Sequence, residues 1–293
     1  MNKITQKLLR TAVNCLLAVT VTLSCFFTGY AVYVTIQAQK AQRQMEELHQ
    51  LYHNGEKPSN PEDDEWTEDW VDPQLTALYK INPDLVGWLE LGGEGGFAAP
   101  VVQRDNKYYL KHDFYGNEDR HGAVFLDYRN RVEPNDDNLI LYGHNMNDGA
   151  WFNFLVNYQD PEFVRAEPII TFNTLHKEGS YVVYGVFVAA TLEEHGDDFD
   201  YHNRVEFQVI EDKQDYLDRV GRRSLLDTGV EATVRDDLLT LSTCLYDFSG
   251  ERLVVVARRL REEETEEDFA ALPVVRRTDP EMPEIWYKLY GGG

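Results

Sequence analysis

Short apolar runs separated by turn-forming residues dominate the middle of the chain. Most of them are rich in β-branched or aromatic residues and are bounded by Gly, Pro, Asn or Asp, which is typical of β-strands. They lie at residues 86–91, 99–103, 122–127, 138–142, 168–172, 180–190, 238–243 and 252–258. About eight strands at irregular spacing favour a closed barrel over a parallel α/β sheet. We therefore expect a mainly β fold.

Helical periodicity interrupts this pattern at three places. Two inserts are expected at 149–158 and 208–226, and the second has Tyr216, Leu217 and Val220 on one face. A third helical pattern precedes the strands, from about Trp66 to Tyr79, and is broken by Pro73. The sequence thus predicts N-terminal helices and a helix in the long connection before the strand 238–243.

The N-terminus has the apolar pattern of a membrane helix. Residues 11–36 are mostly apolar and follow a basic flank, residues 1–10. A bilayer-spanning helix needs about 20 apolar residues. A cleaved signal peptide is the alternative, but its apolar core is only about 7–15 residues long, so an uncleaved anchor is favoured. The basic flank predicts a single-pass protein of the cell membrane, with a cytoplasmic N-terminus and an extracellular C-terminal bulk.

Composition divides the rest of the chain into three parts. Residues 37–65 are expected to form a stalk and linker, residues 66–260 the main domain with its N-terminal helical extension, and residues 261–293 an acidic tail. We expect Trp286 and Tyr287 to dock this tail on the barrel, since exposed aromatic side chains so close together are unusual.

The strong acidity of the chain limits its partners. The formal net charge is −23, and residues 1–37 contribute three basic and no acidic side chains, so the remainder carries −26. Such a surface repels phosphate backbones and argues against nucleic-acid binding. We interpret the acidic clusters near residues 62–69 and 262–268 as solvated. The sequence predicts no metal and no cofactor.

Three side chains suited to acyl transfer stand at the ends of predicted strands. Cys244 ends one strand, His144 follows another, and Arg252 opens a third. Of three cysteines, Cys15 and Cys25 lie in the apolar N-terminal stretch, so Cys244 has no disulfide partner in the extracellular part. A thiolate attacks carbonyls, an imidazole transfers protons, and a guanidinium stabilises an oxyanion. An inert core cysteine is the alternative interpretation.

The motifs around these residues resemble those of the sortase family, and more closely its class B. The matching stretches are Thr240-Leu241-Ser242-Thr243-Cys244 with Arg252, Leu141-Tyr142-Gly143-His144-Asn145-Met146, and Val101 to Leu110. The resemblance runs from about residue 82 to residue 260. It implies an eight-stranded sortase-type barrel and a membrane-anchored cysteine transpeptidase of Gram-positive bacteria.

The resemblance also implies partners and roles. Cys244 would attack the Thr carbonyl of a C-terminal sorting signal on a secreted protein, His144 would protonate the leaving amine, and Arg252 would hold the carbonyl or oxyanion. The acceptor would be an amine of a peptidoglycan precursor or of a pilin. Tyr142, Ser242 and Thr243 would line the peptide groove.

Two other functions compete with this interpretation. An L,D-transpeptidase also uses Cys, His and Arg, but its Arg stands two residues after the thiol, whereas here the separation is eight. A catalytically silent, peptide-binding domain of the same fold is the non-enzymatic alternative, and retention of all three side chains argues against it.

Overall fold

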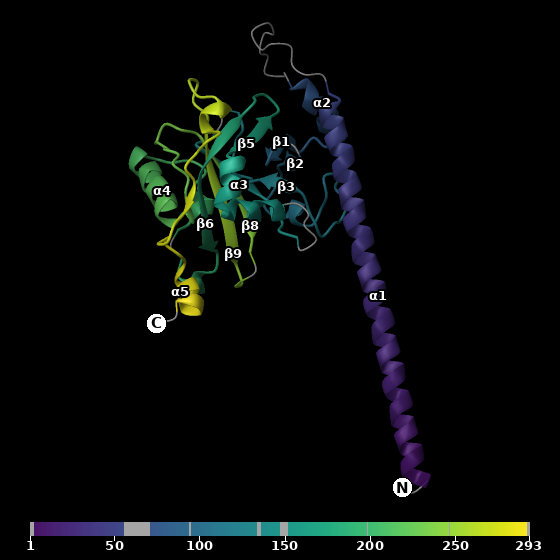
Figure 1. Cartoon of the computed structure of the whole chain (residues 1–293). Helices are drawn as coiled ribbons and strands as arrows, with labels where there is room; N and C mark the ends of the chain where they lie inside the picture. Colours follow the sequence, from purple (N-terminus) through teal and green to yellow (C-terminus); the bar gives the residue numbers. More distant parts are fainter. Residues whose placement is uncertain are drawn as a thin grey trace. The chain divides into compact units, whose positions relative to one another are not determined.

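Eight strands close into a single barrel in the order β1-β2-β3-β4-β8-β9-β6-β5 (Figure 1). The computed structural model describes residues 3–55, 71–93, 95–133, 136–146, 152–197, 199–245 and 247–291. The predicted closed β-barrel is therefore confirmed. The barrel strands are β1 Leu85–Leu91, β2 Phe97–Val102, β3 Val124–Leu126, β4 Asn138–Tyr142, β5 Ile169–Thr174, β6 Ser180–Ala190, β8 Leu238–Cys244 and β9 Glu251–Arg259.

The barrel mixes strand directions. β4 runs parallel to β8, and β2 runs parallel to β3, while the other neighbours are antiparallel. Parallel neighbours require a long crossover connection. The connection from β4 to β8 therefore contains β5, β6 and the predicted helical insert. Because β4 and β8 run the same way, both end at the same rim of the barrel.

Five α-helices and five 3-10 helices accompany the strands in the described residues. The α-helices are α1 Lys3–His53, α2 Pro73–Ile81, α3 Pro161–Ala166, α4 Ile210–Arg223 and α5 Glu284–Tyr290. The 3-10 helices are η1 Tyr108–Leu110, η2 Phe152–Gln159, η3 Glu193–His195, η4 Tyr201–Asn203 and η5 Glu266–Phe269. The helix expected at 208–226 is confirmed as α4. The insert expected at 149–158 is η2, and its first three positions lie outside the described residues, as do Trp66 and Trp70.

The helix α4 packs on the barrel as its sequence period predicts. Tyr216, Leu217 and Val220 are all buried, and they join a cluster with Phe187 of β6 and Val254 of β9. Figure 1 shows this helix beside β6 on the outer face of the barrel. Burying one aliphatic side chain of this size contributes roughly 1.5–3 kcal/mol. The helix thereby fixes the end of the long connection that leads to β8.

The chain divides into two compact units, residues 1–46 and residues 47–293. Within the described residues, one helix is long and apolar enough to cross a membrane, and its span begins at Arg10 near the N-terminus. In the second unit, the last turns of α1 belong to the hydrophobic core. Tyr52 stacks on Trp88 of β1 with ring centroids 4.4 Å apart, and Leu48 is 1% exposed.

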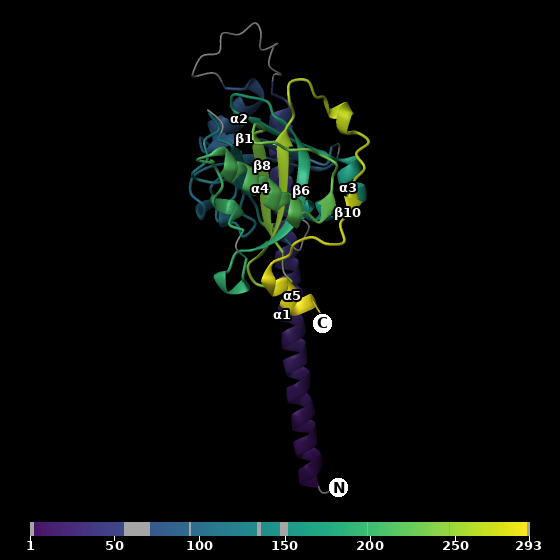
Figure 2. The ribbon, with the colours of Figure 1, turned by 90° about the vertical axis from the view of Figure 1, so that its left-hand side faces the viewer.

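The residues after β9, here called the C-terminal segment (residues 261–291), run along the outside of the barrel (Figure 2). A two-residue strand, β10 Val275–Arg276, pairs antiparallel with β7 Leu226–Asp227. The segment buries Phe269, Val274 and Met282.

The aromatic side chains of α5 contact one another. Tyr287 is 48% exposed, and the Trp286 ring packs against Tyr287 and Tyr290 within α5 itself. The expectation that Trp286 and Tyr287 dock the tail stays a prediction. The buried apolar residues of the segment named above precede α5, and their wide spacing gives no periodic pattern.

Candidate active site

The strand order brings the three predicted catalytic residues to one rim of the barrel. Tyr142 of β4 is the register partner of Ser242 of β8, so His144 and Cys244 each lie two residues beyond a paired position. Across the other edge of β8, Cys244 is directly opposite Arg252 of β9. Residues 100 positions apart in sequence thus become neighbours through backbone register alone.

Hydrogen bonds join the histidine segment to the cysteine strand beyond the last paired residues. The Gly143 amide donates to the Ser242 carbonyl at 3.3 Å, and the Thr243 hydroxyl donates to the Gly143 carbonyl at 2.8 Å. The Asn145 side chain then donates to the Cys244 carbonyl at 2.7 Å. These contacts flank both His144 and Cys244, so they fix the relative position of the two backbones.

Gly143 is required for close packing beside His144. A Cβ atom at this position would lie 2.7 Å from the ring of Phe152, which is fully buried in η2. Such an approach is far inside van der Waals contact, and a buried aromatic ring cannot yield without opening a cavity. The glycine between Tyr142 and His144 therefore lets η2 pack directly under the histidine segment.

The connection between β2 and β3 orients the His144 ring. Its Nε2 atom lies 2.8 Å from the Leu110 carbonyl oxygen, which can only accept, so Nε2 carries the proton of this hydrogen bond. The ring atom Nδ1 is then the nitrogen that this hydrogen bond leaves unoccupied. Gly122, with a φ of +63°, packs against the same ring, and a Cβ there would lie 3.3 Å from His144 Cδ2.

Arg252 is held by the turn that links it to Cys244. Its Nη1 donates to the Glu251 carbonyl at 2.9 Å. Glu251 is 2% exposed, and its carboxylate accepts the Asp247 amide at 2.9 Å. Burial raises the pKa of Glu251. This side chain thus braces the turn between the two catalytic strands, while the Arg252 charge remains available to a substrate.

The three residues predicted to bind substrate lie beside the catalytic residues, but their polar groups have internal partners. The Tyr142 hydroxyl donates to Asp127 at 3.1 Å, and burial raises the Tyr142 pKa. Ser242 and Thr243 are 2% and 1% exposed. The Ser242 hydroxyl is 2.8 Å from the buried hydroxyl of Tyr201. Ser242 and Thr243 are therefore better placed to support the cysteine strand than to contact a peptide directly.

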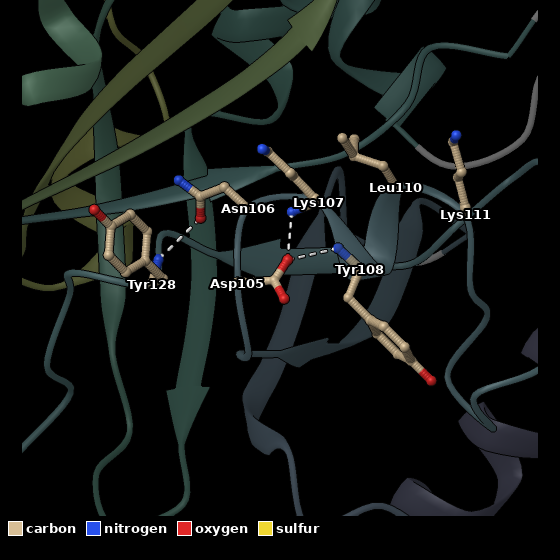
Figure 3. A pocket seen from close by; sticks show the side chains of 7 residues that line it. All are labelled: Asp105, Asn106, Lys107, Tyr108, Leu110, Lys111 and Tyr128. Atoms are coloured by element: carbon tan, nitrogen blue, oxygen red, sulfur yellow. Dashed lines mark hydrogen bonds between the residues drawn. The ribbon is translucent and has the colours of Figure 1, made fainter.

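A hollow of about 760 Å³ opens on the connection between β2 and β3 (Figure 3). Its lining residues are Asp105, Asn106, Lys107, Tyr108, Leu110, Lys111 and Tyr128. Leu110, whose carbonyl binds His144, stands between Lys107 and Lys111, and all three side chains point to the same side in this view. A ligand in this hollow would therefore meet two ammonium groups.

Sequence reasoning missed several supporting residues. Leu110 acts through its backbone carbonyl, which no side-chain motif reveals, and Tyr201 reaches Ser242 from a loop 41 residues away in sequence. Asn145 directly follows His144 in sequence. This position, together with the ability of an amide to donate a hydrogen bond, could have predicted its contact with the cysteine strand. Among the described residues, no group of three or more His, Cys, Asp or Glu side chains could hold a metal ion.

Comparison with known proteins identifies the class. The Sortase domain model matches residues 94–260, more than half of the chain. Sortase B of Staphylococcus aureus is 34% identical over 197 residues, which cover 66% of this chain and 78% of the relative. Sortase B of Listeria monocytogenes is 35% identical over 188 residues, covering 63% and 73%.

Solved structures agree with the sequence matches. A structure described as a Staphylococcus aureus sortase B–substrate complex aligns with a TM-score of 0.65 and 30% identity, covering 78% of this chain and 100% of that one. The chain belongs to the sortase family of cysteine transpeptidases. Its relatives place it in class B, as its motifs predicted.

Proposed function

We propose that this protein cleaves a C-terminal sorting signal after a threonine and transfers the new carboxyl end to an amine. The observation that carries the proposal is the convergence of Cys244, Arg252 and His144 on one rim, with Cys244 and Arg252 as direct register partners. This set supplies a nucleophile, a fixed cation and a proton carrier.

The first half of the reaction forms an acyl-enzyme. The Cys244 thiolate attacks the threonine carbonyl carbon, and the carbonyl oxygen becomes an oxyanion that Arg252 stabilises. As the tetrahedral species collapses, the peptide C–N bond breaks and His144 gives its Nδ1 proton to the departing amine. A thioester between Cys244 and the threonine remains, and His144 is neutral.

The second half regenerates the thiolate. An acceptor amine attacks the thioester carbonyl, again through an oxyanion facing Arg252, and loses a proton to Nδ1 of His144. The C–S bond then breaks, which leaves a new amide, the Cys244 thiolate and a protonated His144. The acceptor is an amine of a peptidoglycan precursor or of a pilin.

The anchoring proposal rests on the N-terminal helix. Its apolar span fits a bilayer, and the basic residues before it fit the cytoplasmic side. The enzyme would then act as a single-pass membrane protein of a Gram-positive cell, with its catalytic domain outside, where secreted proteins and wall precursors meet.

Cleavage of quenched fluorescent peptides tests the function directly. A panel of Asn-Pro-x-Thr-x and Leu-Pro-x-Thr-Gly peptides would be incubated with residues 47–293, and with the same protein carrying Cys244→Ala. We expect cleavage after Thr that the substitution abolishes, and transfer of the acyl group to added hydroxylamine. Absence of cleavage of every peptide, together with slow alkylation of Cys244 by a small reagent, would contradict the proposal.

A further inference from the structure

The C-terminal segment reaches the rim of the barrel that carries the catalytic residues. After β10 it follows the end of α4, where the Glu281 amide donates to the Arg222 carbonyl at 3.0 Å. Figures 1 and 2 both show α5 at the end of the barrel where β8 stops and β9 starts. The family model ends at residue 260, so this segment lies outside the matched region.

A loop between β6 and α4, here called the β6–α4 loop (residues 191–209), flanks the same rim. Its first residue, Thr191, donates to the Gly250 carbonyl from both its amide, at 3.0 Å, and its hydroxyl, at 2.9 Å. The His195 ring packs on the edge of the Phe248 ring, with centroids 5.5 Å apart. Gly250 and Phe248 belong to the turn between Cys244 and Arg252, so the loop supports that turn from outside.

The loop also reaches the cysteine strand from the other side. Tyr201, 2% exposed, places its hydroxyl 2.8 Å from the Ser242 hydroxyl, two residues before Cys244. Burial raises the pKa of the Tyr201 hydroxyl to about 12, and the nearby Arg252 charge opposes this rise. Displacement of the loop would therefore disturb Cys244 and Arg252 together.

A buried ion pair closes the loop against α4. Asp197 binds Arg223 with Oδ1 and Nη2 2.6 Å apart, and their side chains are 0% and 3% exposed. The same carboxylate accepts the amides of Ala190 and Phe199 at 2.9 and 3.0 Å. A buried pair with its oxygens occupied in this way holds one geometry.

The C-terminal segment covers this arrangement. Glu281 places a carboxylate oxygen 3.9 Å from Arg223 Nη2 and 3.4 Å from Arg222 Nε. Glu284 lies against Gly196, because a Cβ at residue 196 would be 2.9 Å from the Cβ of Glu284 and would overlap its carboxylate. One short stretch, residues 278–290, thus contacts the loop at Gly196 and the end of α4 at Arg222 and Arg223, the helix end to which Asp197 of the loop is paired.

We propose that residues 278–290 form a clasp that holds the β6–α4 loop in the conformation required for catalysis, with Glu281 and Glu284 as positioning residues. Ordering a long loop costs backbone conformational entropy. Contacts along its outer side offset part of this cost and reduce opening. The effect on catalysis rests on the proposed function, whereas the effect on loop opening does not.

Hydrogen exchange and kinetics of a truncated protein test the clasp. Residues 47–277 keep β10 but lose the clasp, and residues 47–291 serve as the control. We expect faster exchange in peptides covering 190–203 and roughly a tenfold lower kcat/KM for peptide cleavage, since small displacements of catalytic groups cost that much or more. Unchanged exchange across 190–203 in a truncated protein with native circular dichroism would overturn the proposal.

A double substitution covers the case in which the truncated protein does not fold. Glu281→Ala with Glu284→Ala removes only the contacting carboxylates, and Glu262→Ala with Glu263→Ala makes the same charge change at exposed positions of the same segment. Faster exchange at 190–203 in the Glu281→Ala, Glu284→Ala protein, with wild-type exchange in the control, supports the clasp. Equal exchange in the two proteins overturns it. If the unsubstituted protein cleaves no peptide but the double substitution still speeds exchange at 190–203, the clasp is supported and the proposed transpeptidase activity is rejected.

Discussion

The barrel is stabilised by one kind of contact, and the C-terminal segment is held in place by another. In the barrel, Cys244, His144 and Arg252 are positioned by the register of three neighbouring strands, β4, β8 and β9. The C-terminal segment has only a two-residue strand, and it is fastened largely by side chains. Backbone ladders position catalytic residues without demands on their side chains, which leaves the thiol, the imidazole and the guanidinium for chemistry.

Arginine–carboxylate pairs replace the ladder in the C-terminal segment. The buried Arg258 of β9 binds Glu264 at 2.6 Å, and Arg261 binds Asp236 at 2.9 Å. Each pair joins the start of the segment to the barrel end of β9 or to the turn before β8. Each such contact depends on a single charged side chain, so one substitution can detach part of the C-terminal segment. A barrel strand is instead held by many backbone hydrogen bonds, each of which contributes little.

The largest expected effect in the barrel is the loss of proton transfer. His144→Gln keeps a side chain of similar size, so the fold and the melting temperature should remain near those of the wild type. General acid–base catalysis contributes about 10²–10⁴-fold, and we expect a fall in kcat of that order. Steady-state cleavage of the best panel peptide measures it. Wild-type kcat in the substituted protein would show that another group carries the proton.

Loss of the fixed cation should come next. Removal of one oxyanion donor costs about 10²–10³-fold in kcat, and we expect this for Arg252→Ala. Arg252→Lys keeps the charge but lacks the planar fork of donors, so partial recovery is expected. A fall in binding alone, seen as a higher KM with normal kcat in both proteins, would assign Arg252 to ground-state binding of the peptide.

A glycine beside the histidine allows a sharper test of geometry. Gly122→Ala introduces a Cβ that overlaps the Tyr109 carbonyl and approaches the His144 ring, so we expect roughly a tenfold lower kcat. Gly116→Ala is a matched control, because its φ is also positive, +77°, and its Cβ would meet only the Tyr108 hydroxyl at 3.4 Å. Equal losses of activity in the two proteins would point to backbone strain instead of displacement of His144.

In the C-terminal segment, we expect a change in stability with a smaller change in kcat. Glu264→Gln leaves Arg258 buried without its charged partner, and we expect a loss of about 2 kcal/mol in the free energy of unfolding. Glu263→Gln, an exposed neighbour with the same chemical change, should have almost no effect. Urea unfolding of both proteins measures the difference, and similar midpoints would remove the ion pair from the account.

The pH dependence of this difference identifies its origin. The hydrogen bond from Arg258 lowers the pKa of Glu264 in the folded state. A lowered pKa stabilises the folded protein above the unfolded value, near about 4.3, and this contribution is lost as pH falls through the folded value. The gap between wild type and Glu264→Gln should therefore narrow between about pH 5 and pH 3. A constant gap would indicate packing as its source.

The same contrast explains what could be predicted from the sequence. The eight barrel strands follow from apolar runs, because each run buries a face that must be hydrophobic. Cys244, His144 and Arg252 stand at run ends, so a barrel brings them to a rim whatever the details of its loops. Support from the Leu110 carbonyl and the Tyr201 hydroxyl depends on how long loops fold back, which no local pattern encodes. The clasp likewise rests on individual charges spaced without a period.

The most direct test of the central claim is the mass of Cys244 during turnover. Residues 47–293 would be mixed with a cleaved panel peptide, quenched in acid within seconds and digested for mass spectrometry. We expect an adduct on Cys244 with the mass of the peptide fragment that ends in threonine, bound through the threonine carbonyl, and we expect this adduct to disappear when hydroxylamine is added. Peptide cleavage with an unmodified Cys244 at every time point, and with full activity of Cys244→Ala, would contradict it.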